Sequence, residues 1–150
     1  MTDRGLICFD YGEKRIGVAV GQHLTGTATP LETIPVRKGR PDWRRITAVI
    51  ERWQPAALIV GDPLNMDGTR QPVSDAADRF ARRLAGRFKL PVHRADERLS
   101  TFEARDRAGR SGDLDAVAAQ VILESWLAEH PGDGGPGDRM PGAEPTSGRE

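Results

Sequence analysis

Cysteine, long apolar runs and histidine patterns typical of metal sites are scarce or missing in this sequence. Its single cysteine, Cys8, excludes a disulfide framework and cannot build a zinc site, and its three histidines are scattered without the spacing of metal ligands. No apolar stretch approaches the ~20 residues that cross a membrane, and the N-terminus lacks the pattern of a signal peptide. These absences predict a reduced, cytoplasmic protein with no membrane segment.

A strong charge of either sign is also missing, because the 150 residues include 22 basic and 22 acidic side chains. Half of residues 131–150 are glycine or proline, so we expect a disordered tail after one folded domain, residues 1–130. That domain has 20 basic and 18 acidic residues, a net charge of +2. Proteins that hold bare nucleic acid by charge alone are usually more basic. A nucleic-acid substrate would therefore need local basic patches and metal ions.

The apolar pattern predicts an α/β domain built on a mixed sheet. Continuous apolar runs indicate buried strands, whereas Pro30 and Pro35 place the third strand toward an edge, because proline donates no ladder hydrogen bond. A basic loop, 37–40, follows that strand. The expected strands are 6–9, 16–20, 27–36, 56–61 and 90–95, and the expected helices are 41–54, 72–88, 99–104 and 114–129.

Two of the expected helices have a clear apolar stripe. The first buries Trp43, Ile46, Ile50 and Trp53. The second presents, on another face, Arg79, Arg83 and Arg87. Asp75 and Asp78 each precede an arginine by four residues, which is typical of ion pairing along a helix. We therefore interpret this arginine face as solvated, with a nucleic-acid patch as the alternative.

Three acidic positions far apart in the sequence are candidates for one site. Asp10 follows the first apolar run, and Asp96-Glu97 follows the last expected strand. Ligands gather where the chain leaves the carboxyl ends of strands, so these acids meet if the two strands lie near each other. Asp115 is in register with an apolar face that must pack on the sheet, Ala118, Ala119, Ile122 and Trp126.

Two of these acids also have simpler interpretations. Asp10 is explained equally well as a solvated turn residue, since aspartate is common in turns. Asp115 is explained as a first-turn acid that favours the helix dipole, although Asp113 already suits the cap position.

Three converging carboxylates would repel each other unless a cation lay among them. Mg²⁺ or Mn²⁺ prefers such oxygen ligands, and one or two ions would suit in-line cleavage of a phosphodiester bond. No Ser-His or Cys-His nucleophile pattern competes, and the GxxxxGK[ST] loop of nucleoside triphosphatases is absent. The acids therefore favour a metal-dependent phosphoryl site.

Four motifs, in order, carry a family resemblance. They are 9–19 (FDYGEKRIGVA), 61–69 (GDPLNMDGT), 96–101 (DERLST) and 115–123 (DAVAAQVIL). Together, over residues 5 to about 128, they closely resemble the YqgF/RuvX family of pre-16S rRNA nucleases, also called Holliday-junction-resolvase-like proteins. The resemblance implies a ribonuclease H-like fold with a five-stranded mixed sheet flanked by helices.

The resemblance also implies roles for particular residues. The family's acidic triad, which would bind the catalytic metal, is matched by Asp10, Glu97 and Asp115. Lys14 and Arg15 would lie beside it, near the phosphate backbone. The other implied substrate contacts are Asn65, Arg98, Ser100 and Thr101. The implied activity is hydrolytic processing of the 5′ end of the 16S rRNA precursor, with precursor rRNA or a pre-ribosomal particle as partner. We expect a monomer or a weak homodimer.

Two departures from the family pattern bear on substrate binding. Asp62 stands where the family usually has leucine, which adds an acid near the expected phosphate path. The segment 105–114 is shorter than usual and lacks the customary Lys/Arg cluster before the last helix. The arginine face of helix 72–88, or Arg105, Arg107 and Arg110, would have to replace that cluster.

Three other functions stay open at this stage. The first is a junction-resolving DNA endonuclease on the same fold. The second is a non-catalytic factor in ribosome assembly or transcription that keeps the nuclease fold. The third starts from Asp10-Tyr11-Gly12, which is similar to the phosphate loop of actin-like ATPases. Those proteins need two such domains, for which 150 residues are too few.

Overall fold

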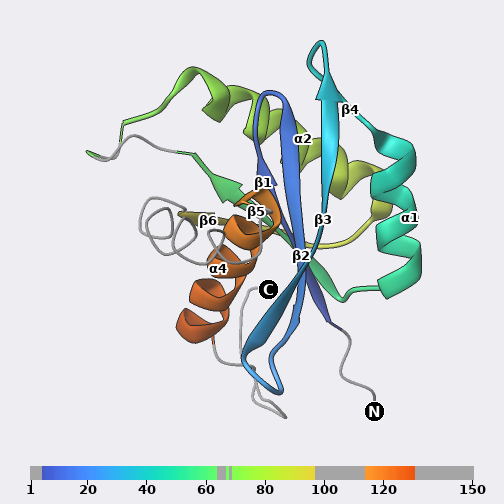
Figure 1. The fold of residues 1–150 in the computed structure, drawn as a ribbon, viewed down its shortest axis with the longest axis vertical. Coiled ribbons are helices and arrows are strands. Elements are labelled where there is room, and N and C mark those ends of the chain that lie inside the picture. The colour runs from blue at the N-terminus through green and yellow to red at the C-terminus, as the bar shows by residue number, and fades with distance from the viewer. Residues whose placement is uncertain (1–4, 64–66, 68, 97–113, 131–150) are drawn as a thin grey trace.

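The computed structural model describes residues 5–63, 67, 69–96 and 114–130, which form one mixed sheet with helices on both faces (Figure 1). The strands are β1 (Leu6–Tyr11), β2 (Arg15–Gln22), β3 (Thr27–Arg37), β4 (Arg40–Pro41), β5 (Ala57–Asp62) and β6 (Val92–Asp96). The helices are α1 (Trp43–Trp53), α2 (Pro72–Phe88) and α4 (Leu114–Glu129). The predicted α/β class is confirmed. Among these helices none is long and apolar enough to cross a membrane.

The sheet order β4-β3-β2-β1-β5-β6 fixes where the site can form. β1 pairs antiparallel with β2 and parallel with β5, which in turn pairs parallel with β6. The carboxyl ends of β1, β5 and β6 therefore meet at one edge of the sheet. This arrangement confirms that the strand before Asp10 and the strand before Glu97 lie near each other, with β5 between them.

The expectation of five strands is wrong by one, because the described part of the sheet has six. The added strand, β4, pairs with Val36–Arg37 at the end of β3, where the sequence predicts a loop. Lys38 and Gly39 both have positive φ, 54° and 74°. Two such residues make a tight hairpin turn that matches the twist of the flanking strands, so the chain reverses at once and pairs again.

The face covered by α1 and α2 contains the larger apolar core. Phe80 on α2 lies at its centre, with ring centroids 5.7 Å from Phe9, 5.0 Å from Tyr11 and 5.5 Å from Trp43. Large side chains from four strands surround these rings: Ile7, Ile16, Val18, Ile34, Val36, Leu58 and Val60. Burial of each such side chain contributes about 1.5–3 kcal/mol, so this face supplies much of the stability.

On the face covered by α4 the strands contribute mostly small side chains, with Leu6 and Ile59 as the large ones. The small ones include Cys8, Ala19, Ala28 and Ala57, which pack against Ala119, Ile122 and Leu123 of α4. A Cβ atom built on Gly17 would lie 1.8 Å from the backbone oxygen of Asp115. Only glycine at this position allows the first turn of α4 to approach β2 so closely.

A bulge in β3 lets one strand serve both faces. Val18 of β2 pairs with Glu32, but the next residue, Ala19, pairs with Pro30, so Leu31 is an extra residue in β3. The extra residue reverses the alternation of side chains. Ala28 consequently faces α4, whereas Ile34 and Val36 face α1 and α2.

The ends and faces of α1 follow the sequence with one exception. The carboxylate of Asp42 accepts a hydrogen bond from the Arg45 backbone N–H at 3.3 Å, which caps the helix start. The predicted burial of Trp53 is wrong, because this residue is 40% exposed at the last position of the helix, where Arg52 lies over its ring. Val49 is buried in its place.

The acids of α2 pair with arginines outside the helix rather than with those four residues later. Arg70, just before α2, contacts Asp75 at 2.9 Å and Asp78 at 2.6 Å. Arg94 of β6 contacts Asp78 at 2.5 Å. These pairs connect the start of α2 to β6, which the spacing along the helix cannot show.

Candidate active site

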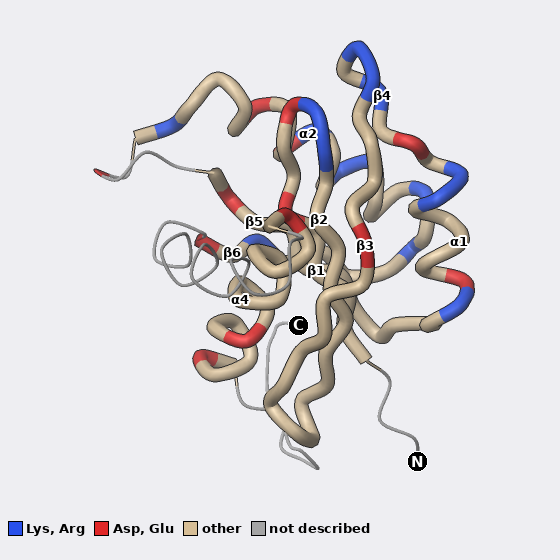
Figure 2. The backbone as a smooth tube through the Cα atoms, in the orientation of Figure 1, with Lys and Arg blue, Asp and Glu red and all other residues tan. Residues whose placement is uncertain are grey.

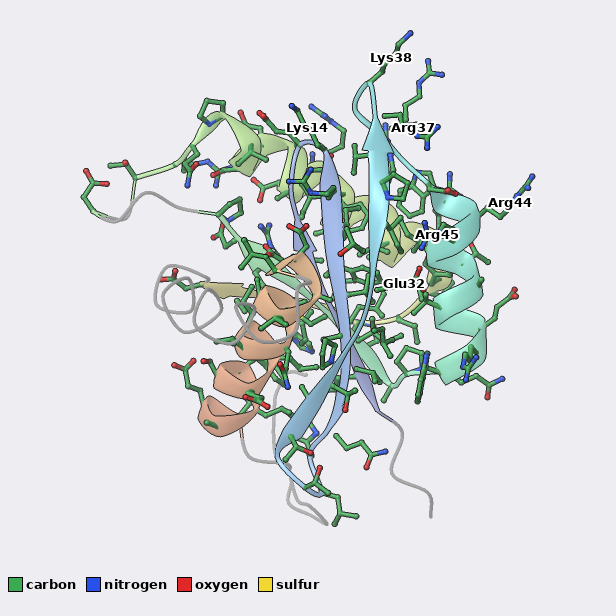
Figure 3. All side chains as sticks on the ribbon, viewed as in Figure 1. Lys14, Glu32, Arg37, Lys38, Arg44 and Arg45 are labelled. Carbon is green, nitrogen blue, oxygen red and sulfur yellow. The ribbon has the colours of Figure 1, made fainter. Side chains whose placement is uncertain are left out.

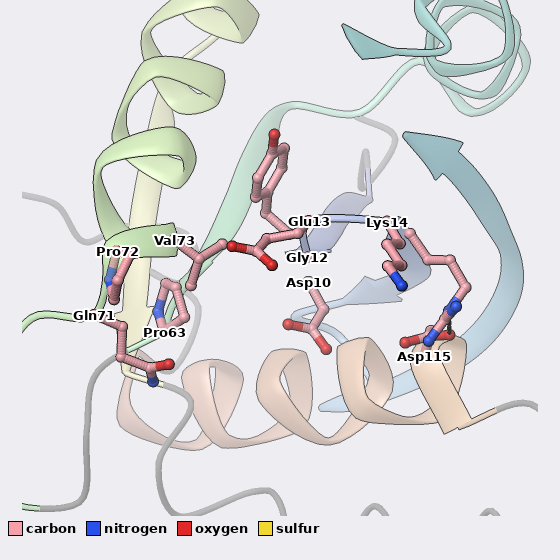
Figure 4. A pocket seen from close by; sticks show the side chains of 11 residues that line it. Asp10, Gly12, Glu13, Lys14, Pro63, Gln71, Pro72, Val73 and Asp115 are labelled. Carbon is pink, nitrogen blue, oxygen red and sulfur yellow. Dashed lines mark hydrogen bonds and ion pairs between the residues drawn. The ribbon is translucent and has the colours of Figure 1, made fainter. Parts of the chain in front are cut away.

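A pocket of about 490 Å³ opens at the carboxyl end of β1 (Figure 4). Its lining comes from β1 and the β1–β2 turn, from the residues around the start of α2, and from the first turn of α4. The lining residues are Asp10, Tyr11, Gly12, Glu13, Lys14, Arg15, Pro63, Gln71, Pro72, Val73 and Asp115.

Strand alternation explains why Asp10 faces this pocket. Leu6 and Cys8 point toward α4, so Asp10, two residues further, lies on the same face of the sheet. Asp10 is opposite Gly17 in the β1–β2 ladder, and the first turn of α4 lies against Gly17. Figure 4 shows the Asp10 carboxylate above α4, in the space shared with Asp115.

Asp115 reaches the same pocket through α4. Its backbone rests on Gly17, and its carboxylate accepts a hydrogen bond from Arg15 Nε at 3.0 Å. The guanidinium of Arg15 is more than half exposed and the Asp115 side chain one-third exposed, so this ion pair adds little to stability. Its consequence is positional, because it fixes the Asp115 carboxylate at the pocket rim. The predicted convergence of Asp10 and Asp115 agrees with this geometry.

The β1–β2 turn supplies the cations of the pocket. The turn is tight, with the Gly12 backbone N–H donating to the Arg15 carbonyl at 2.9 Å. In Figure 4 the Lys14 side chain extends between Asp10 and Asp115. Lys14 and Arg15 are thus placed beside the acids, where the sequence expects them.

The opposite wall of the pocket is the start of α2, which sequence reasoning missed. The Ser74 hydroxyl is fully buried, accepts a hydrogen bond from the Gln71 N–H at 2.9 Å and donates one to the Pro63 carbonyl at 2.9 Å. This hydroxyl ties the residues after β5 to the start of the helix. The available signal was a serine three residues after Gln71 at a helix start.

Two further residues of the β1–β2 segment shape the pocket. Burial raises the pKa of the Tyr11 hydroxyl, against smaller opposing effects of Arg79 and Arg83, so Tyr11 is protonated at neutral pH. Glu13 lines the pocket too, and in Figure 4 its carboxylate extends toward Val73. The sequence predicts no role for Glu13, because its position indicates only a residue of the β1–β2 turn.

Several predicted site residues lie outside the described residues: Asn65, Glu97, Arg98, Ser100 and Thr101. Most of the short segment 105–114, with its three arginines, lies outside them as well. In the described part of the chain, no three His, Cys, Asp or Glu side chains group closely enough to hold a metal ion. The full acidic triad therefore stays a prediction, whereas two of its members do line one pocket.

Asp62, which departs from the family pattern, has a cationic partner within the fold that it shares with Asp78. Its carboxylate lies 3.4 Å from the guanidinium of Arg94, and Arg94 also donates hydrogen bonds to the Val60 and Gly61 carbonyls. Arg94 therefore partly offsets the charge of Asp62 near the expected phosphate path.

The pocket thus combines two carboxylates from distant parts of the sequence with a lysine and an arginine. Carboxylate oxygens are the ligands that Mg²⁺ and Mn²⁺ prefer, so this donor set fits a hard divalent cation. The cations on the rim suit the non-bridging oxygens of a phosphate. Such a set can bind and polarise a phosphodiester, and among the described lining residues no side chain is arranged for nucleophilic attack.

Comparison of sequences finds close relatives over most of the chain. A protein of Azotobacter vinelandii named "Putative pre-16S rRNA nuclease" is 52% identical over 136 residues, which cover 85% of this chain and 96% of that one. A protein of Yersinia pestis with the same name is 49% identical over 140 residues, covering 88% of this chain and all of that one.

Comparison of structures finds the same fold in more distant proteins. The RuvC protein of Thermus thermophilus, solved with a Holliday junction substrate, superimposes with a TM-score of 0.55 at 16% identity, covering 84% of this chain and 95% of that one. The fowlpox virus resolvase, solved with Holliday junction DNA, gives 0.53 at 12% identity, covering 83% and 97%. These likenesses confirm the predicted ribonuclease H-like architecture. The RuvX family, described as Holliday junction resolvase, matches residues 4–129, and this chain belongs to it.

Proposed function

We propose that the protein is a metal-dependent nuclease that hydrolyses phosphodiester bonds, and that it matures the 5′ end of the 16S rRNA precursor in the cytoplasm. The observation that carries the proposal is the meeting of Asp10 and Asp115 in one pocket, although 105 positions separate them in the sequence. The names of the relatives support rRNA as the substrate.

Asp10 and Asp115 would hold the metal, with Glu97 as the third ligand. A divalent ion such as Mg²⁺ or Mn²⁺, one or two per site, supplies activation of water and stabilisation of the leaving oxygen when it is bound. The fit rests on the oxygen donors that β1 and α4 present to the same space, because two carboxylates beside each other favour a cation.

The cationic side chains of the pocket would hold the substrate. Lys14 lines the same pocket as the two acids, and its ammonium would contact a phosphate oxygen. Arg15 already keeps the Asp115 carboxylate oriented through its 3.0 Å contact, and it offers further N–H donors to the substrate backbone. The implied contacts of Asn65, Arg98, Ser100 and Thr101 belong to the same proposal.

The test compares cleavage of two nucleic acids in the presence of Mg²⁺ or Mn²⁺. One is an RNA that contains the 16S leader and the mature 5′ end, and the other is a four-way DNA junction. We expect cleavage of the RNA. Cleavage of the junction alone would replace this proposal with a junction-resolving endonuclease, which the fold of the structural neighbours favours. RNA binding without cleavage of either substrate would favour an assembly factor.

Substitution of the two acids tests the mechanism. Asp10→Asn and Asp115→Asn should each lower the cleavage rate by more than about 100-fold, because even groups outside the direct ligands cost 10- to 100-fold. Both should also weaken Mn²⁺ binding measured by calorimetry, with little change in melting temperature. Glu51→Gln on α1, an exposed acid outside the pocket, is the matched control. Unchanged cleavage by Asp10→Asn would refute the metal mechanism.

A further inference from the structure

The β3–β4 hairpin and the start of α1 carry a concentration of positive charge that lies outside the pocket. Positions 36–45 contain five basic side chains and one acidic one, a net charge of +4, whereas all of residues 1–130 amount to +2. Figure 2 shows the basic residues together at the tip of the hairpin and along the start of α1, and Figure 3 shows the side chains of Arg37, Lys38 and Arg44 extending from the molecule.

The acids near the hairpin do not neutralise it. The carboxylate of Glu32 pairs with Arg45, and the carboxylate of Asp42 caps α1. Within the described residues, Arg37, Lys38 and Arg40 are exposed and have no ion pair. These three side chains, here called the hairpin cations, surround a shallow depression of about 450 Å³ that Pro35 and Asp42 also line.

The hairpin adjoins the candidate active site. The Val36 backbone N–H donates a hydrogen bond to the Lys14 carbonyl at 2.8 Å, and Arg15 pairs with Pro35 in the β2–β3 ladder. Lys14 lines the pocket. Val36, which is hydrogen-bonded to Lys14, directly precedes Arg37 in the chain. The backbone that carries Lys14 and Arg15 is therefore paired with the strand that leads into the hairpin.

The backbone of the turn is a second, independent observation. Lys38 has φ of 54°, a conformation that is unfavourable for a residue with a side chain and that usually selects asparagine, aspartate or glycine at this place. Lysine here sacrifices some stability and gains a cation at the tip of a rigid two-residue turn. Since the turn is tight and β4 is paired, the backbone positions that carry the three cations are fixed relative to one another.

We propose that the hairpin cations bind the phosphate backbone of the RNA strand that extends from the scissile bond, as a binding track outside the active-site pocket. Backbone contacts fit the chemistry, because three of the five residues that line the depression are basic, the one acid, Asp42, caps α1, and none of the five has an aromatic ring on which a base could stack. The track gives affinity and position without reading sequence. It also supplies the local basic patch that a chain of nearly balanced charge needs.

The test measures RNA binding by fluorescence anisotropy without divalent ion, so that it does not depend on cleavage. The probe is a labelled single-stranded RNA of about 20 nucleotides, titrated at several salt concentrations. The variant is Arg37→Gln/Lys38→Asn/Arg40→Gln, in which asparagine keeps the positive φ. The control, Arg52→Gln/Arg82→Gln/Lys89→Asn, removes the same charge from exposed sites elsewhere, and Lys89 also has positive φ, 56°.

The expected result is a change in the hairpin variant alone. Its slope of log affinity against log salt should decrease by about 2, since each phosphate contact of a single strand contributes about 0.7. Its affinity at low salt should fall by at least about 10-fold. Arg37→Lys/Arg40→Lys, which keeps the charges, should bind nearly as the natural protein does. Equal effects of the hairpin variant and the control would overturn the track, and so would no effect of either.

Cleavage assays separate this inference from the proposed function on which it rests. If both hold, the hairpin variant should raise KM for long RNA with little change in kcat, and should hydrolyse bis(p-nitrophenyl) phosphate normally. A protein that binds RNA through the hairpin and cleaves nothing would refute the nuclease and keep the track. A protein that cleaves RNA with the same KM after the hairpin substitutions would refute the track and keep the nuclease. If the triple variant does not fold, Arg40→Gln alone should show a slope decrease of about 0.7.

Discussion

The two faces of the sheet differ in the size of their side chains and in what they support. On the face of α1 and α2, phenylalanine, isoleucine, leucine and valine fill the space around Phe80. On the face of α4, alanines, Cys8 and Gly17 leave room for the helix backbone to approach β2. The core of the first face is apolar around Phe80, whereas the second face ends in the pocket with Asp10 and Asp115.

This difference separates stability from chemistry. Large side chains contribute more transfer free energy, so the α1–α2 face can hold the fold together. Small side chains contribute less, but they set the distance between sheet and helix, and that distance places Asp115 beside Arg15. Changes on the first face should therefore alter stability, and changes on the second face should alter the site.

The largest loss of stability should follow Phe80→Ala. Removal of the ring leaves a cavity among Phe9, Tyr11 and Trp43, which should lower the free energy of unfolding by about 3–5 kcal/mol in urea titrations. Cys8→Ala on the other face should cost only about 1 kcal/mol. Similar losses from both substitutions would break the distinction between the faces.

Gly17→Ala should affect the site more than the fold. The added Cβ would meet the Asp115 backbone at 1.8 Å, so the first turn of α4 must move. We expect a loss of about 1–3 kcal/mol, together with weaker Mn²⁺ binding and slower cleavage. Gly86→Ala is the control, because nothing lies within 4 Å of the added Cβ, and it should stabilise α2 by about 0.5–1 kcal/mol. Full metal binding by Gly17→Ala would show that α4 need not lie this close.

The ion pairs of Arg94 on the α1–α2 face should matter less. Arg94→Met removes the contacts to Asp78 and Asp62 and should cost about 1–2 kcal/mol at neutral pH. Hydrogen bonds from Arg94, and then from Arg70, lower the pKa of Asp78 below its ordinary 3.8, against the opposing effect of burial. The stability that this carboxylate adds is present above that pH and is lost as the pH falls through the lowered pKa. Urea titrations below pH 4 should show a shallower decline in Arg94→Met, and an unchanged decline would contradict this role.

The smallest effect should be a pH dependence at the far end of α4. The His93 ring lies against Trp126, with centroids 5.3 Å apart, and partial burial followed by the charge of His130 lowers the pKa of His93 from 6.5. A lowered histidine pKa adds stability that is present above pH 6.5 and declines as the pH falls below it. His93→Gln should reduce the difference in unfolding free energy between pH 7.5 and 5.5. His130→Gln should reduce it only in part.

Local chemistry allowed some elements to be predicted closely. Helix 72–88 agrees with α2 at both ends, because Pro72 suits a first helical turn and the stripe around Phe80 has helical spacing. The apolar run 56–61 agrees with β5 to within one residue at each end. Asp10 and Asp115 were brought together by strand ends and helix register, which are also local properties.

Other features depend on contacts that no local pattern contains. β4 exists only because β3 offers it a partner, and its turn uses lysine where asparagine or glycine is usual. Asp75 and Asp78 pair with Arg70 and Arg94 because the tertiary fold brings those arginines closer. The contribution of α2 to the pocket could not be predicted, because it depends on how the chain after β5 returns to the sheet. Tertiary proximity decided each of these cases.

The extra residue at Leu31 has a consequence for how the chain can vary. Deleting it would restore uniform alternation along β3, and a slip of one position would turn Ile34 and Val36 to the opposite face of the sheet. The number of residues between the β2–β3 turn and the β3–β4 turn is therefore as constrained as the identity of a core residue. Insertions and deletions should be tolerated in the exposed turn around Thr25 and Gly26, and rejected between Leu31 and Gly39.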